Sequence, residues 1–433
     1  MGKTVYLCFT TDIIHSAHVN IIERAAALGD VMIGVLSDEA ATGYRHYPLM
    51  SYQDRVNIFS HLKHVTKVVE QKTVSYAENI RTYRPDYVVH GDEWIHNYER
   101  PVRDEVIALL EEYGGELVEF PYDHSKEYTS IEQAVRAQLA IPDRRRGRLR
   151  ALLDMKPLLT VMEAHSGITG LIVEETKVIK DGEAKQFDAM WVSSLCDSVA
   201  KGKPDIEVVD FSSRLRTIDD IMEVTTKPII MDGDTGGVTE HFIYTVRTLE
   251  RVGVSAVIIE DKIGLKKNSL FGTDVVQQQD EVAHFCEKIA AGKRAQKTKE
   301  FMIIARCESL ILERGMEDAL MRTRAYAKAG ADGIMIHSRS HSPEEIITFV
   351  KEFRRTDQDT VLVVVPTTYS TIYEEELKKL GVNIVIYANQ LTRSGFPAMQ
   401  KTAQTILSNG RAYEVEESLM PVKEILTLIP EEF

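Results

Sequence analysis

Eight short apolar segments recur at regular intervals in the second part of the chain, and this repetition constrains the fold more than any other feature. They are rich in Val and Ile and span residues 158–165, 189–194, 228–234, 256–262, 302–308, 333–339, 361–367 and 383–389. Apolar runs without polar alternation are typical of strands buried on both faces, which occur in parallel sheets. Several of the intervening stretches, such as 316–331, have a helical pattern. The sequence therefore predicts a (β/α)8 barrel.

Each of these predicted strands ends in polar residues that could carry chemistry. In order along the chain they are Glu163 and His165, Ser193, Asp232 and Asp234, Glu260 and Lys262, Arg306 and Glu308, His337, Thr367, and Asn389. The strand ends of a barrel converge on one face, where active sites of this fold lie. We therefore expect an active site at that face.

The first part of the chain is predicted to form a separate, Rossmann-like α/β domain. Its strand-like segments are 3–10, 31–37, 64–70, 85–91 and 115–120, and a helical pattern runs from His18 to Gly29. A doubly wound sheet of this kind binds ligands at the carboxyl ends of its strands. We place this domain at residues 1–140 and the barrel at 158–433. Residues 141–157, with five arginines, form a basic linker that either packs against the acidic body or binds an anion.

Composition excludes several classes of protein. The 433 residues carry a formal net charge of −14, which argues against nucleic-acid binding through a basic surface. The apolar runs fall short of the roughly 18 residues that a membrane-spanning helix needs. The four cysteines are scattered and suggest neither a disulfide framework nor a zinc site. We expect a soluble, cytoplasmic protein with small-molecule substrates.

Acidic and basic residues at the barrel's strand ends predict a metal site beside an anion site. Asp232, Asp234 and Glu260 would place three carboxylates together, and oxygen ligands of this kind select Mg²⁺ or Mn²⁺. Cationic donors, which we take to be Lys266, Arg306 and His337, would face an anion with several negative oxygens. Such a site suits a phosphorylated carboxylic acid.

Several motifs of the barrel resemble those of one enzyme family. EDKIGLKKNS (260–269), MDGDTGG (231–237), IIARCES (303–309), MIHSR (335–339) and MEAHSG (162–167) resemble segments of phosphoenolpyruvate mutases of the isocitrate lyase superfamily, in the same order. The likeness covers residues 155–425. It implies a Mg²⁺-dependent interconversion of phosphoenolpyruvate and phosphonopyruvate. Within EDKIGLKKNS, the segment GLKKNS lacks the catalytic cysteine that the superfamily's carbon–carbon lyases carry there. A phosphonopyruvate hydrolase remains an alternative.

The resemblance also implies roles for individual residues. Asp232 would bind Mg²⁺ directly, with Asp234 and Glu260 acting through water. Asp205 would lie beside the transferring phosphorus, with Asp197 as the alternative. The remaining implied contacts are Arg306 and His337 to the phosphoryl group, Trp191 and Ser193 to the pyruvyl end, and Lys266, Asn268 and Ser269 on a gating loop.

In the first domain, two histidines stand where a strand turns into a helix. His15 and His18 would add donors to a helix N-terminus, which favours phosphate. The segment resembles the HxGH motif of glycerol-3-phosphate-type cytidylyltransferases, with Ala17 in the glycine position, and further echoes lie at 34–39, 51–55 and 88–94. This implies transfer of CMP from CTP to a small phosphonate, unless the domain is a degenerate nucleotide-binding module.

For that domain, the resemblance implies phosphate contacts and a nucleotide pocket. Arg45 and Arg55 would contact phosphate, and Asp92 and Trp94 would lie in the nucleotide pocket. Thr129 and Ser130 match a late segment of that family. The mutase resemblance further implies a homo-oligomer in which residues 418–429 pack on a neighbouring copy.

Overall fold

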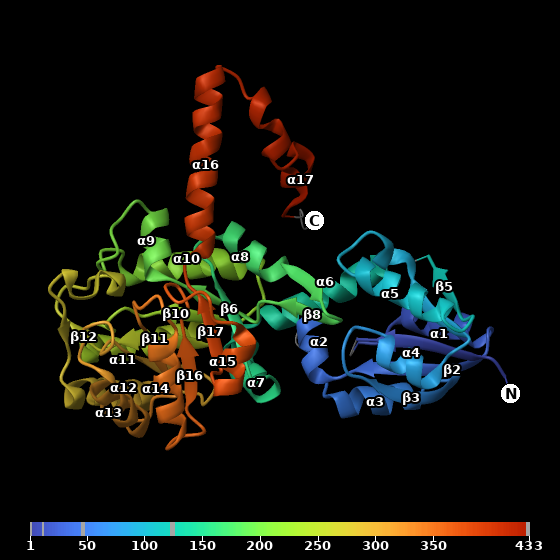
Figure 1. Ribbon diagram of the computed structural model, residues 1–433, viewed down its shortest axis with the longest axis horizontal. Helices are drawn as coiled ribbons and strands as arrows, with labels where there is room; N and C mark the ends of the chain where they lie inside the picture. Colours follow the sequence, from blue (N-terminus) through green and yellow to red (C-terminus); the bar gives the residue numbers. More distant parts are fainter. Residues whose placement is uncertain (1, 11–12, 45–47, 122–125, 430–433) are drawn as a thin grey trace. The chain divides into compact units, whose positions relative to one another are not determined.

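A computed structural model describes residues 2–10, 13–44, 48–121 and 126–429, without the side chains of residues 126–132. The chain divides into two compact units. The first comprises Met1–Leu139, Ala151–Lys156 and Glu175–Asp188, and the second comprises Ala140–Arg150, Pro157–Glu174 and Ala189–Phe433. Each unit is described by itself below (Figure 1).

The first unit is built on a five-stranded parallel sheet of order β3-β2-β1-β4-β5. The strands are β1 (Thr4–Phe9), β2 (Asp30–Leu36), β3 (Val65–Gln71), β4 (Tyr87–Gly91) and β5 (Glu116–Phe120). All five predicted strands are confirmed, because their apolar runs are buried between helices on both faces. The order reverses between β1 and β4, and ligands of doubly wound sheets bind at such a point.

Helices and one 3-10 turn surround this sheet. They are α1 (Ser16–Ala26), α2 (Asp38–Tyr44), α3 (Tyr52–Ser60), α4 (Ala77–Tyr83), η1 (Asp92–Ile95), α5 (Arg100–Glu111) and α6 (Lys126–Ala140). Phe9, Ile22 and Val89 belong to one apolar cluster, and Tyr6, Tyr76 and Trp94 belong to the other. The sheet therefore separates two cores, one on each face.

The second unit is a closed barrel of eight parallel strands, as predicted. The strands are β6 (Leu159–Glu163), β9 (Ala189–Val192), β10 (Ile229–Asp232), β11 (Ala256–Glu260), β14 (Met302–Cys307), β15 (Gly333–Ile336), β16 (Val361–Val364) and β17 (Ile384–Tyr387). Four of the eight strands, β9, β10, β11 and β15, are buried along their whole length, and each of the other four has one partly exposed residue. A continuous apolar run in the sequence thus corresponds to a strand covered on both sides.

Helices and short elements connect the barrel strands. The helices are α8 (Gly167–Glu175), α9 (Ser194–Ala200), α10 (Phe211–Val224), α11 (Thr239–Val252), α12 (Val282–Ala295), α13 (Met316–Lys328), α14 (Glu344–Arg354) and α15 (Glu374–Leu380). Between β11 and α12 run the paired strands β12 (Lys262–Ile263) and β13 (Gln278–Gln279), with η2 (Ser269–Asp274) between them. This segment is the predicted gating loop.

A hairpin that was not predicted from the sequence lies between α8 and β9. Strands β7 (Lys177–Lys180) and β8 (Glu183–Gln186) form it, with Asp181 and Gly182 at φ 54° and 75° in the turn. An Asp-Gly pair with two positive φ angles matches the commonest tight hairpin turn. The Ser75 amide donates to the Gly182 carbonyl at 3.1 Å. The hairpin thus packs within the first unit, although the barrel sequence surrounds it.

The expected basic linker forms the helix α7 (Pro142–Met155), and three of its five arginines are structural. Arg145, Arg146 and Arg148 are buried. Arg146 Nη1 donates to the Glu250 carbonyl at 2.9 Å, and Arg148 Nη1 donates to the Thr226 carbonyl at 2.6 Å. Because their donors are used on main-chain oxygens, these arginines serve packing rather than anion binding.

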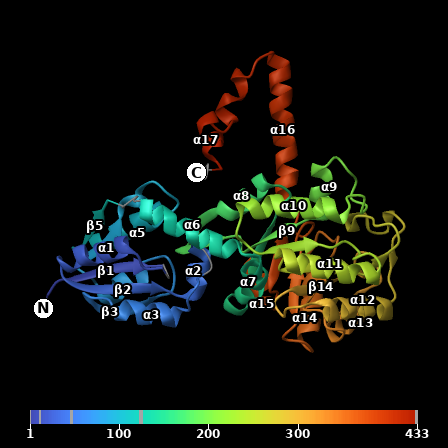
Figure 2. The ribbon, with the colours of Figure 1, turned by 180° about the vertical axis from the view of Figure 1, so that it is seen from behind.

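The last elements project from the barrel (Figure 1 and, from behind, Figure 2). They are α16 (Gln390–Asn409), η3 (Tyr413–Ser418) and α17 (Val422–Thr427). Every residue of α16 is at least partly exposed, and Leu407 and Leu426 are 86% and 75% exposed. Among the described residues, none of the helices combines the length and apolar content needed to cross a membrane.

Candidate active site

Seven of the twelve predicted strand-end residues line one small cavity of about 60 Å³, and they are Ser193, Asp232, Glu260, Arg306, His337, Thr367 and Asn389. The other five are not among its lining residues, and they are Glu163, His165, Asp234, Lys262 and Glu308. Asp232 ends β10, Glu260 ends β11, Arg306 lies on β14 and His337 follows β15. The cavity is further lined by Trp191, Ser193, Ser194, Asp205, Lys266, Asn268 and Ser269. Residues far apart in the sequence therefore share one polar chamber at the carboxyl ends of the strands.

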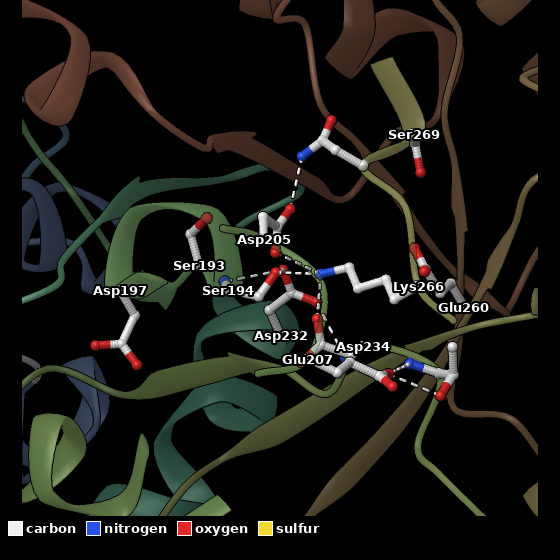
Figure 3. Close-up of polar contacts among 12 residues, drawn as sticks. Ser193, Ser194, Asp197, Asp205, Glu207, Asp232, Asp234, Glu260, Lys266 and Ser269 are labelled. Carbon is white, nitrogen blue, oxygen red and sulfur yellow. Dashed lines mark hydrogen bonds and ion pairs between the residues drawn. The ribbon is translucent and has the colours of Figure 1, made fainter. Parts of the chain in front are cut away.

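The Lys266 ammonium occupies the centre of the acidic cluster (Figure 3). Its Nζ donates to Asp205 Oδ1 at 2.8 Å and to Ser194 Oγ at 2.5 Å, and it forms a close ion pair with Asp234. Ser194 Oγ in turn donates to Asp232 Oδ2 at 2.8 Å. Burial disfavours the charge on Lys266, but the surrounding carboxylates outweigh burial and raise its pKa. The chamber is therefore built to hold positive charge.

Asp232 is ionised in this setting. Burial alone would raise its pKa, but the positive charges of Lys266, Arg214 and Arg306 overcome that cost and hold the pKa at about 2. An acid held as its anion at neutral pH is a strong ligand for a hard cation.

Arg214, which was not predicted from the sequence, organises the acidic loop after β10. From α10 its Nη1 donates to Asp234 Oδ2 at 2.9 Å, and its Nη2 donates to the Val192 carbonyl at 3.1 Å. The same loop needs Gly233, because a methyl group there would lie 2.9 Å from the Ile258 carbonyl oxygen. Asp234 follows at φ 53°. An arginine inside a helix gives no sequence signal that separates it from a surface residue.

A second layer of the chamber surrounds Arg306. Its Nη2 donates to Ser269 Oγ and its Nε to Glu308 Oε1, both at 2.5 Å. Arg306 Nη2 also lies 3.4 Å from His337 Nδ1. Burial lowers the pKa of His337 to about 3, and the charge of Arg306 adds to this effect. The expectation that His337 is cationic is therefore wrong: the ring is neutral, because a second positive charge beside buried Arg306 is unfavourable.

The structure brings Asp205, and not Asp197, into the chamber. Asn268 Nδ2 donates to Asp205 Oδ2 at 2.7 Å, while Lys266 binds the other oxygen. Asp197 is buried on α9, where it accepts a hydrogen bond from Thr217 Oγ1 at 2.7 Å and lies apart from the other labelled carboxylates (Figure 3). Asp197 therefore anchors a helix beneath the site.

The predicted gating loop covers the chamber with its polar side. Lys266, Asn268 and Ser269 point inward to the contacts above, whereas Phe271 and Val276 are 53% and 96% exposed. A cavity of about 60 Å³ corresponds to about two water molecules. A larger ligand must therefore displace the Lys266 and Asn268 contacts when the loop opens.

The donor set fits a magnesium ion held by few protein ligands. Within the described residues, no three His, Cys, Asp or Glu side chains form a ready-made metal cage. Mg²⁺ usually takes one or two carboxylates and keeps several waters. Asp232 and Glu260 both line the chamber, and a cation, the Lys266 ammonium, already lies among the acidic side chains. These residues therefore suit the expected ion without enclosing it.

The first unit contains a larger cavity of about 660 Å³ at the β1–β4 switch point. His15, Ala17 and His18 line it from the start of α1, and the two imidazole rings lie 3.9 Å apart between centroids. The His15 amide lies 3.4 Å from His18 Nδ1. Trp94 also lines the cavity, as predicted.

Arg55 and Asp92, which were also predicted for this site, are not among the residues that line the cavity. Arg55 is buried, and its donors go to the Leu36 carbonyl at 2.8 Å and Asp38 Oδ1 at 2.6 Å. Its predicted phosphate contact is therefore replaced by a structural one. Asp92 is outside the lining set, which contains its neighbour Glu93. Arg45 and the side chains of Thr129 and Ser130 lie outside the described residues.

Charged groups gathered at the carboxyl ends of barrel strands are how enzymes of the (β/α)8 class form active sites, and this chain is such an enzyme. The model of the family described as Phosphoenolpyruvate phosphomutase matches residues 149–407, and the chain belongs to that family, within the phosphoenolpyruvate mutase/isocitrate lyase superfamily. A Cytidylyltransferase-like model matches residues 8–131, so the first unit is a cytidylyltransferase-like domain.

Individual relatives include both a mutase and a hydrolase. The chain is 36% identical over 301 residues to phosphoenolpyruvate phosphomutase of Streptomyces hygroscopicus, covering 69% of this chain and 92% of that protein. It is also 36% identical over 282 residues to phosphonopyruvate hydrolase of Variovorax sp., covering 65% and 93%. A solved phosphonopyruvate hydrolase complex with oxalate and Mg²⁺ is 34% identical, with a TM-score of 0.58 and coverage of 66% and 94%.

Proposed function

We propose that the barrel interconverts phosphoenolpyruvate and phosphonopyruvate. The observation that carries the proposal is the array in which Asn268 and Lys266 hold the two oxygens of Asp205 beside Asp232. The reaction is an isomerisation: the bond between phosphorus and the enol oxygen breaks, and a bond between phosphorus and the methylene carbon forms. Nothing else is consumed or released.

The residues of the chamber divide this task between charge and position. Asp232, supported by Asp234 and Glu260, would hold Mg²⁺, which would neutralise negative charge on the enolate and carboxylate oxygens. Arg306 and Asn268 supply donors for the phosphoryl oxygens, and the neutral His337 adds one more. Asp205 faces the migrating group and guides it. The closed loop keeps water away, since water would otherwise capture the phosphoryl group.

The competing reaction is hydrolysis of phosphonopyruvate, which the relative in Variovorax sp. favours at equal identity. Asn268 weighs against hydrolysis, because an amide binds phosphoryl oxygens without activating water. Phosphorus NMR of the protein with phosphonopyruvate and Mg²⁺ separates the two reactions. Conversion to phosphoenolpyruvate supports the mutase, whereas free phosphate with pyruvate would replace it by a hydrolase.

We further propose that the first unit transfers CMP from CTP to a small phosphonate. His15 and His18 at the start of α1 face a cavity large enough for a nucleotide, and a helix N-terminus favours phosphate. In the alternative, a degenerate module would bind CTP without turning it over, because the methyl group of Ala17 stands where the related motif has a glycine next to the phosphates. Pyrophosphate release with CTP, Mg²⁺ and a panel of phosphonates tests the transfer, and its loss in His18→Ala tests the histidine.

The same proposal includes the setting in which the protein works. Four cysteines, all free, suit a reducing cytoplasm. The proposal also includes a homo-oligomer that forms through the exposed elements α16 and α17.

A further inference from the structure

We propose that the cavity of the first unit recognises an ammonium group, so that the acceptor of CMP is an aminoalkylphosphonate and not its hydroxyalkyl analogue. This inference rests on the proposed nucleotidyl transfer and specifies its substrate. The side chains that carry it, Glu93 and Glu99, line the cavity together with Tyr76 and Trp94.

The cavity has two chemically different regions, one on each face of the sheet. His18 packs edge-on against Phe9, with ring centroids 5.5 Å apart, and Phe9 belongs to the core beside α1. Tyr76 and Trp94 belong to the core on the opposite face. A ligand at the switch point therefore meets histidines on one side and the acidic, aromatic region on the other.

Rigid aromatic rings form the wall of the acidic region. Trp94 stacks on His90 with centroids 3.7 Å apart, and Tyr76 lies 6.1 Å from Trp94. Trp94 Nε1 donates to Glu119 Oε1 at 2.6 Å, which fixes the indole in place. Aromatic faces attract cations through their negative π-surface, and such rings form the cages that bind ammonium groups.

Two carboxylates lie at this wall, and their local contacts do not use up their capacity. Glu93 Oε2 is buried and has no hydrogen-bond partner among the described residues. Glu99 is 5% exposed, and its Oε2 accepts a hydrogen bond from Asn97 Nδ2 at 2.6 Å. Although Glu99 stands at the N-cap of α5, its side chain forms no cap hydrogen bond with the described first turn.

The energetics of Glu99 favour a positively charged ligand. Burial raises the pKa of Glu99 to about 7, although the positive charge of Lys177 on the β7–β8 hairpin opposes the shift. A buried carboxylate without a full counter-charge is costly. An ammonium group offers three hydrogen-bond donors and a full positive charge, whereas a hydroxyl group offers one donor and carries no charge.

An ammonium group at this position also directs the chemistry. A phosphonate oxygen attacks the α-phosphorus of CTP and forms the new P–O bond, the α–β bridging bond breaks, and pyrophosphate leaves. The protonated amine has no lone pair and takes no part. By keeping the amine protonated, Glu93 and Glu99 would prevent attack by nitrogen and leave the phosphonate oxygen as nucleophile.

The competing interpretation is that the carboxylates bind the exocyclic amino group of cytosine. That group is neutral, and a single acceptor satisfies each of its N–H donors. The two interpretations differ in which substrate, the phosphonate or CTP, has the higher KM when a carboxylate is replaced by a neutral amide.

The test compares 2-aminoethylphosphonate with 2-hydroxyethylphosphonate as acceptors for the full chain with CTP and Mg²⁺, by pyrophosphate release. We expect kcat/KM to be about tenfold or more higher for the amine. Glu99→Gln and Glu93→Gln should each remove most of this preference by raising the KM of the amine, with the KM of CTP unchanged. The matched control is Glu78→Gln, an exposed carboxylate paired with Lys72 that should keep the wild-type preference.

An equal or greater rate with the hydroxyl compound would overturn the inference while leaving the nucleotidyl transfer intact. A rise in the KM of CTP in the glutamine variants would assign the carboxylates to cytosine instead. If no acceptor releases pyrophosphate, the transfer itself fails. Saturation-transfer NMR with 2-aminoethylphosphonate then decides the ammonium site: binding lost in Glu93→Gln supports it, and unchanged or absent binding rejects it. Circular dichroism excludes misfolding.

Discussion

At the scale of single residues, the chamber of the barrel is defined by how it compensates buried charge. Lys266 neutralises carboxylates that would otherwise repel one another, and it does so from the gating loop. Because Lys266 lies on the predicted gating loop, a movement of this loop would also change the charge balance of the chamber.

Asp205 is the residue whose loss should affect catalysis most selectively. We expect Asp205→Asn to lower the rate of interconversion by about 10²–10⁴-fold, because the amide cannot guide the phosphoryl group electrostatically. Phosphorus NMR measures the rate, and titration calorimetry should show nearly unchanged Mg²⁺ affinity. Asp219→Asn, an exposed position on α10, is the control. A wild-type rate in Asp205→Asn would move the role to another residue.

His337 should make the barrel less stable in mild acid. Its folded pKa of about 3 lies below the unfolded value of about 6.5, so between these values the unfolded chain binds the proton and the folded chain does not. Stability contributed by the neutral ring is therefore lost as pH falls from about 7. Between pH 7 and 5 the wild type should lose about 2 kcal/mol more than His337→Asn in urea unfolding. Parallel losses in the two proteins would show that His337 is not buried as a neutral ring.

At the scale of elements, the β7–β8 hairpin links the sequence of the barrel to the first unit. It follows α8 in the chain, yet it packs beside Ser75, next to the cavity residue Tyr76. The positive charge of Lys177, on this hairpin, also opposes the rise in the pKa of Glu99 that burial causes. An excised first domain that ends near residue 140 would therefore lack part of its own structure.

Gly182 is the position that tests this packing. At φ 75° it has no room for a side chain, since an added Cβ would lie 2.8 Å from Ser75 Cβ. Gly182→Ala should destabilise the first unit by about 1–3 kcal/mol in thermal unfolding and lower any CTP-dependent activity. Gly114→Ala is the matched control, because Gly114 has a similar φ of 80° and nothing within 4 Å of its added Cβ. Equal effects in both variants would mean that backbone strain, and not the hairpin contact, is responsible.

At the scale of the whole molecule, α16 and α17 expose apolar residues that another protein surface could bury. Met399 and Leu407 on α16 and Ile425 and Leu426 on α17 are each more than half exposed. Exposed apolar patches of this extent usually mark an interface. A second copy of the chain is the covering surface that the family resemblance predicts.

This prediction can be tested by charge. Leu426→Glu should shift the protein to a smaller assembly in light scattering, because a carboxylate cannot be buried in an apolar interface without cost. Lys423→Glu, on the same helix, is the control for added negative charge, since it changes the net charge by −2 where Leu426→Glu changes it by −1. Wild-type protein that is already a monomer would contradict the predicted assembly.

Apolar runs and turn residues determined the architecture without any tertiary information. Thirteen strands were predicted from them, because a strand buried on both faces must be apolar at successive positions. The strand-end rule also brought Asp232, Glu260 and Arg306 together, since barrel topology converges those ends whatever the side-chain details. The β7–β8 hairpin was not predicted from the sequence, although its Asp-Gly turn is a local signal.

Folding in three dimensions decided the rest, because charge state and partner choice depend on groups distant in sequence. Arg214 acquires its role only when α10 packs under the acidic loop, and Arg55 loses its predicted role by binding Asp38. His337 becomes neutral because Arg306 and burial disfavour a second charge. Glu93 and Glu99 look like surface residues of a turn until the sheet places them beside Tyr76 and Trp94, since electrostatic free energy depends on distance and solvent access rather than on residue order.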